Sequence, residues 1–261
     1  MKTVNLALLI ALLALAGCAT QPAESEIKPA TSTTGNETDQ QLRARIHTEL
    51  ASGYYELGNM GVALEEVNEA LRADPNYVPA HNVAGLVYAN LKEDRLAQQS
   101  FIRALSINPL DSDANNNYGM FLCQKKREEE AIKYFLTALR NPLYQYPDRS
   151  YLNAGLCSRR RGDTAAAEDY FQRALKLRPN QPQALYQLAD IEYARGNLAE
   201  AKEILGRFTN VAAATAEVLW LGVRVARKLG DRNAEASYAL QLRKNHPGSK
   251  EARALAAGQY E

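Results

Sequence analysis

Small and large apolar residues recur along this chain at a nearly fixed interval. Within one interval, Ala97, Phe101 and Ala104 are separated by four and three residues, which places them on one face of a helix. Prolines or glycines follow such stretches and predict helix ends. The same residue types return in steps of 34 or 36 residues, as in the series Ala63, Ala97, Ala131, Ala167 and Ala201 and the series Phe101, Phe135 and Phe171. The pattern predicts repeated pairs of helices.

Thirty-four residues is the length of one tetratricopeptide helix–turn–helix unit, and the recurring residues resemble that family's pattern. The resemblance implies an all-α fold, a right-handed α-solenoid of six tetratricopeptide repeats (TPRs) that folds as one domain. We expect the small pair Ala84 and Gly85 to allow a neighbouring helix to approach closely. A cap or tail is expected at 248–261. The six repeats are predicted at 44–77, 78–111, 112–147, 148–181, 182–215 and 216–247.

The N-terminal segment has the features of a targeting signal. Eleven apolar residues run from Leu6 to Ala16, which as a helix span about 16 Å, half of a bilayer core. The segment Leu15-Ala16-Gly17-Cys18 resembles the bacterial lipobox, so we expect residues 1–17 to be a lipoprotein signal peptide and Cys18 to carry acyl chains such as palmitate. The polar stretch 18–43 is expected to be a flexible tether. Ala19 follows this cysteine, as in lipoproteins that are sorted to the outer membrane, and this resemblance implies a lipid anchor at the periplasmic face of that membrane.

Charge and motifs exclude several classes of function. The chain has 31 basic and 30 acidic residues and a net charge of +1, so it lacks the basic field of a nucleic-acid-binding protein. No metal-binding, phosphate-binding or redox motif occurs in the sequence, and no catalytic residues are predicted. We therefore expect a protein that is not an enzyme, with no cofactor, no metal and no small-molecule substrate.

The first helix of each repeat is expected to line the concave surface of the solenoid, where side chains contact a partner. The mixture of apolar and polar residues there suits an extended peptide or a helix. The expected contact residues, from repeats one to four, are Arg45, Thr48, Ser52, Tyr55, Asn82, Leu86, Asn116, Met120, Leu152 and Arg159.

Cys123 and Cys157 occupy position 12 of the third repeat and position 10 of the fourth. These positions resemble ones that face each other across adjacent tetratricopeptide units, and the periplasm is oxidising. We expect an intramolecular disulfide. The alternative is two buried free thiols, the commoner state of cysteine in helical cores.

Several segments resemble the PilF/PilW family more specifically than the repeat residues do. They are NNYGMFLC, YPDRSYLNAGLC, NQPQALYQLADIEYARGN and SYALQLRKNHPGS. The resemblance implies an outer-membrane lipoprotein required for type IV pilus biogenesis, a pilotin whose partner is the pilus secretin subunit and which supports its localisation and multimer assembly. The alternative is a TPR lipoprotein adaptor for another envelope machine, such as barrel assembly or peptidoglycan enzymes.

Overall fold

The computed structural model describes residues 38–260. The predicted signal peptide, Cys18 and most of the predicted tether lie outside these residues. The described part is all-helical and has no strand, which confirms the predicted fold class. Its helices are α2 (Asp39–Glu56), α3 (Met60–Ala73), α4 (Val78–Asn90), α5 (Asp94–Ile107), α6 (Ser112–Gln124), α7 (Glu128–Ala138), α8 (Pro147–Arg161), α9 (Thr164–Leu177), α10 (Pro182–Arg195), α11 (Leu198–Val211), α12 (Ala216–Leu229), α13 (Arg232–Asn245) and α14 (Lys250–Ala256).

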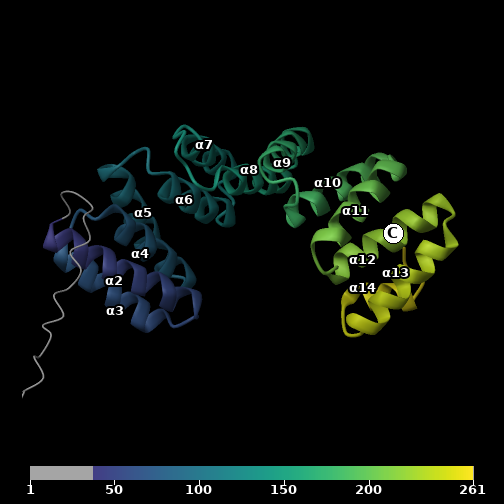
Figure 1. Cartoon of the computed structure of the whole chain (residues 1–261), viewed down its shortest axis with the longest axis horizontal. Helices are drawn as coiled ribbons and strands as arrows, with labels where there is room; N and C mark the ends of the chain where they lie inside the picture. The colour runs from purple at the N-terminus through teal and green to yellow at the C-terminus, as the bar shows by residue number, and fades with distance from the viewer. Residues whose placement is uncertain (1–37, 261) are drawn as a thin grey trace, which may run out of the picture. The chain divides into compact units, whose positions relative to one another are not determined.

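The helices pack as six consecutive pairs, from α2 with α3 to α12 with α13 (Figure 1). Each pair contacts the next pair along the chain, through consecutive helices such as α3 and α4 and through successive first helices such as α4 and α6. Helix α14 packs on α12 and α13 at the end of the stack. This neighbour-only packing is that of a solenoid, in which each repeat buries its apolar face against the next.

Helix α2 begins earlier in the chain than the repeat predicted at 44–77. Residues 39–43, predicted to end the tether, form the first turn of α2. Thr38 and Gln41 explain this start: the Gln41 amide donates to Thr38 Oγ1 (3.2 Å) and the Thr38 amide donates to Gln41 Oε1 (3.1 Å). This reciprocal capping box satisfies two backbone donors that the helix itself leaves unpaired.

The turn inside each repeat needs one residue in the left-handed region of backbone conformation. Gly162, Gly196 and Gly230 end their helices with φ of 88°, 85° and 71°. At the same place in repeats two and three the chain has lysine: Lys92 and Lys126 take φ of 65° and 61°. A side chain in this region costs energy that glycine avoids.

The core is built from matched small and large residues on the two helices of a repeat. Gly85 on α4 lies against the ring of Phe101 on α5, and an added Cβ would stand 2.6 Å from Phe101 Cε1. Ala84 and Phe101 are both buried. The close approach expected at Ala84 and Gly85 is therefore present, and the aromatic ring fills the space that it leaves.

Candidate partner-binding surface

A large hollow lies mainly on the first helices of repeats one and two, and Asp113 and Asn117 of α6 also line it. Its volume is about 550 Å³. Six of the ten predicted contact residues line it. These are Arg45, Thr48, Ser52, Tyr55, Asn82 and Leu86. The sequence pattern therefore brings these six side chains together on one surface.

The remaining lining residues give this hollow its charge and its apolar wall. The lining contains one basic residue, Arg45, and three acidic residues, Glu49, Glu56 and Asp113. Its net charge is therefore −2 (1 − 3). Burial raises the pKa of the Asp113 carboxyl, and the nearby Asp111 acts in the same direction. Apolar surface comes from side chains of α4 and of two loops, namely Pro79, Val83, Tyr77 and Tyr146. Such a lining suits a peptide that carries apolar and basic side chains.

Thr48 and Ser52 already use their hydroxyl protons within α2. Thr48 Oγ1 donates to the Ala44 carbonyl (2.7 Å), and Ser52 Oγ donates to the Thr48 carbonyl (2.9 Å). Thr48 is also buried. Towards the hollow, these two hydroxyl oxygens can therefore act only as hydrogen-bond acceptors.

Asparagine side chains link the first helices of repeats two, three and four. Asn117 Nδ2 donates to Asn82 Oδ1 (3.1 Å), and Asn116 Nδ2 donates to Asn117 Oδ1 (3.2 Å). Asn116 Oδ1 accepts from Ser150 Oγ and from Asn153 Nδ2, each at 3.0 Å. The Asn116 side chain is buried and joins neighbouring repeats, because the polar groups beside it need hydrogen-bond partners there.

Leu152 is buried as well, and it packs in a core cluster that extends from repeat four to repeat six. Met120 remains at the surface, with 38% of the residue exposed. Arg159 is engaged across helices: Nη1 donates to Gln187, and Nη2 pairs with Asp190 Oδ2 at 2.7 Å. None of these three lines the hollow of repeats one and two.

The sequence analysis missed the continuation of this surface into repeats five and six. The predicted contacts stand at positions 2, 5, 9 and 12 of their repeats, and the same positions continue along α10 and α12. The partner-facing candidates added there are Tyr186, Asp190, Tyr193, Trp220 and Arg224. Adding one repeat length to Leu152 gives Tyr186, and adding another gives Trp220. The signal that finds these residues was therefore already present in the repeat spacing.

Cys123 on α6 and Cys157 on α8 are joined in the structure, with their Cα atoms 5.9 Å apart. This separation lies in the usual range for a disulfide. Both residues are buried within the cluster that also holds Phe101 and Phe135. A bond at this place links repeats three and four through the core.

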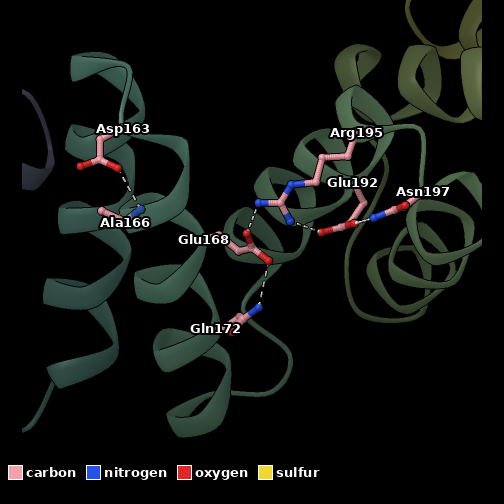
Figure 2. Close-up of polar contacts among 7 residues, drawn as sticks. All are labelled: Asp163, Ala166, Glu168, Gln172, Glu192, Arg195 and Asn197. Carbon is pink, nitrogen blue, oxygen red and sulfur yellow. Dashed lines mark hydrogen bonds and ion pairs between the residues drawn. The ribbon is translucent and has the colours of Figure 1, made fainter.

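Other strong polar contacts serve the junctions between repeats. Arg195, in the last turn of α10, bridges Glu168 on α9 and Glu192 on its own helix (Figure 2). Glu192 is buried and also accepts from Asn197 Nδ2 at 2.7 Å. Glu168 accepts from Gln172 as well. Each charge therefore has a nearby partner, and the network positions repeat five on repeat four.

The described residues contain no group of three or more His, Cys, Asp or Glu side chains able to hold a metal ion. Within residues 38–260 no helix combines the length and the apolar character that crossing a membrane requires.

Comparisons with known proteins identify the family. Tetratricopeptide repeat profiles match residues 78–109, 111–180 and 159–219. The type IV pilus assembly protein PilF of Pseudomonas aeruginosa is 34% identical over 250 residues, which cover 95% of this chain and 96% of the relative. The chain belongs to the PilF/PilW family. Its members are TPR proteins of type IV pilus biogenesis, as the resemblance in the sequence implied.

Solved structures of the PilF/PilW family agree with this assignment. The structure of Pseudomonas aeruginosa PilF has a TM-score of 0.79 and 32% identity, and the match covers 85% of this chain and all of that one. The crystal structure of PilW, described as a widely conserved type IV pilus biogenesis factor, has a TM-score of 0.73 and 35% identity over 82% of this chain and 98% of that one. The similarity thus extends over the whole repeat array.

Proposed function

We propose that this PilF/PilW-family protein is a lipid-anchored pilotin of the outer membrane, which binds the pilus secretin subunit and supports its localisation and multimer assembly. The observation that carries the proposal is the similarity to a pilus assembly protein over nearly the full length of both chains. A relative that matched the repeats alone would indicate the fold but not the pathway.

Two features of this chain give the proposal a mechanism. The lipobox at 15–18 supplies an acyl anchor at Cys18, and the residues up to Thr38 supply reach from the membrane surface. The hollow on repeats one and two supplies a place for a secretin segment. Carriage of the bound secretin to the outer membrane then follows from the sorting of the lipid, and no covalent chemistry is needed.

The anchor is tested by the variant Cys18→Ala. The unacylated protein should be found in the soluble periplasmic fraction, and secretin multimers should be lost from the outer membrane. Normal secretin multimers with the soluble variant would contradict lipid-directed transport.

The hollow is tested separately in the acylated protein. Tyr55→Ala and Arg45→Glu should each weaken co-purification of the secretin, because both side chains line the hollow. Leu177→Ala is the matched control, since Leu177 is an exposed apolar residue on the second helix of repeat four. Equal recovery of the secretin with all three variants would contradict the proposed site.

A further inference from the structure

A second, chemically different hollow lies on repeats five and six. It has a volume of about 370 Å³, and α10, α12 and α14 contribute to its lining. Tyr186 and Trp220 stand at the same repeat position as Thr48 in the first hollow, and Arg224 stands at the position of Ser52. The small polar residues of the first repeat are thus replaced here by two aromatic rings and a guanidinium.

Arg224 lies close to two aromatic rings. Its guanidinium carbon lies 4.7 Å from the centre of the Tyr193 ring and 6.0 Å from that of Trp220. Only 20% of its side chain is exposed. The nearby rings and the low exposure remove part of the hydration of the guanidinium, which strengthens any charged contact that it makes.

Arg224 has few polar partners within the protein to offset the burial of its charge. Its Nε is buried and has no hydrogen-bond partner within residues 38–260. Its Nη2 forms an ion pair with Asp190 Oδ1 at 3.9 Å, which is too long for a hydrogen bond. The other oxygen of Asp190 is paired with Arg159 at 2.7 Å. Two arginines therefore share one carboxylate.

The two carboxylates that line the hollow, Glu217 and Glu251, already have partners. Glu251 is buried beside Lys250, with 3.7 Å between the charged atoms. A backbone amide and the Thr215 hydroxyl hold the pKa of Glu217 below its usual value, so Glu217 is ionised and already hydrogen-bonded. Lys228 adds a further positive charge near Arg224, with its Nζ 4.4 Å from the centre of the Tyr193 ring. Arg224 thus has a longer ion pair than Arg159, and its buried Nε has no hydrogen-bond partner among the described residues.

We propose that this hollow is a second binding site, in which Arg224 takes the carboxylate of an aspartate or glutamate side chain from an extended segment of the protein partner. A planar guanidinium binds a carboxylate through two parallel hydrogen bonds. Tyr186 and Trp220 contact the apolar residues beside that acidic side chain. Tryptophan, tyrosine and arginine are the residue types that dominate binding at protein interfaces.

Charge also distinguishes the two hollows. The lining of the first has a net charge of −2, whereas the two bases and two acids that line the second cancel (2 − 2), and Arg224 shares the carboxylate of Asp190 with Arg159. A partner segment that occupies both is expected to carry basic residues where it meets repeats one and two, and an acidic residue where it meets repeats five and six. This complementarity fixes the direction in which the segment lies.

The test rests on the proposed function for the identity of the partner, the periplasmic region of the cognate secretin. Its binding to the full-length acylated protein in detergent is measured by biolayer interferometry. Arg224→Gln should raise Kd at least about tenfold, and Arg224→Lys should have an intermediate effect because lysine keeps the charge but loses the paired hydrogen bonds. Arg243→Gln, an exposed arginine on α13, is the control and should bind like wild type.

The acidic residue on the partner is then found by changing each aspartate and glutamate of the secretin region to its amide. One change should raise Kd about as much as Arg224→Gln and have no further effect in combination with it. Thermal unfolding of Arg224→Gln separates loss of contact from loss of folding.

The possible outcomes distinguish the two proposals. Unchanged binding of Arg224→Gln overturns the second site and leaves the pilotin function intact. If the effect of Arg224→Gln depends on the C-terminal carboxylate of the secretin region, the ligand is not an acidic side chain and the proposal is overturned. The proposal is also overturned if no acidic residue of the secretin region shows non-additive effects with Arg224→Gln. Failure of the wild-type protein to bind the secretin contradicts the proposed function, and this inference with it.

Discussion

Gly155 lies directly against the ring of Phe171, so that an added Cβ would stand 2.5 Å from Phe171 Cε1 and 2.7 Å from Cδ1. The same pairing of glycine with phenylalanine joins Gly119 to Phe135 in the preceding repeat. In repeat five the equivalent residues are Ala189 and Leu205, both buried. A larger residue on the first helix is thus matched by a smaller one on the second, so the two positions are coupled.

The coupling predicts that Gly155→Ala destabilises the protein by about 1–3 kcal/mol, because the added methyl group overpacks a closed core. Adding Phe171→Leu should recover much of the loss, since it recreates the pair found in repeat five. Gly206→Ala is the control, because no atom lies within 4 Å of its added Cβ. Unfolding in urea measures the free energies of both single variants, Gly155→Ala and Phe171→Leu, of the double variant and of the control. A purely additive double variant would contradict the coupling.

The Cys123–Cys157 bond should leave no free thiol at either position in the protein isolated without reductant. Alkylation after unfolding, followed by mass analysis of the two peptides, should show label only after reduction. Loss of the bond should destabilise the array by about 2–4 kcal/mol, because the bond closes a loop of 34 residues. Labelling of both cysteines before reduction would instead show two free thiols.

Lys92 should be replaceable by glycine with a gain in stability of about 0.5–1 kcal/mol. Its φ of 65° is one that glycine adopts without steric penalty. The reciprocal change, Gly196→Lys, should lower the free energy of unfolding by a similar amount at the equivalent turn of repeat five. Both are measured by urea unfolding, and a loss of stability in Lys92→Gly would show that the lysine side chain has a role of its own.

Asn116→Ala should destabilise the array by about 1–3 kcal/mol, because the buried Ser150 hydroxyl and the Asn153 amide would lose their acceptor. Met120→Ala, on the exposed surface of the same helix, should change the unfolding free energy much less. Thermal unfolding compares the two variants. An equally small effect at Asn116 would return this residue to the set of partner contacts.

Repeat spacing predicted the helix pairs and the tetratricopeptide fold, because each repeat buries the same face against its neighbour, and four more specific segments indicated the PilF/PilW family. Spacing also selected the positions that face a partner, and six of those residues line one hollow. Repeat spacing could not show which residues at these positions make contacts within the protein instead of facing a partner. Asn116 and Leu152 share a repeat position with Thr48, yet one bonds to the next repeat and the other packs in the core. That difference depends on neighbours from other repeats.

The start of α2 shows a similar limit. The stretch around Thr38 has the composition of a linker, and the apolar pattern begins only further along. The helix nevertheless begins at Asp39, because Thr38 and Gln41 cap it. A search for capping residues, as well as for apolar periodicity, would have found this boundary.

The oligomeric state of the pilus secretin in outer membranes tests the central claim most directly. It is compared between wild type and a strain that lacks this protein, on gels run without heat denaturation. We predict that secretin multimers disappear while monomer remains, and that the acylated protein restores the multimers. Intact multimers together with intact pili in the strain lacking the protein would contradict the pilotin function and point to another envelope machine.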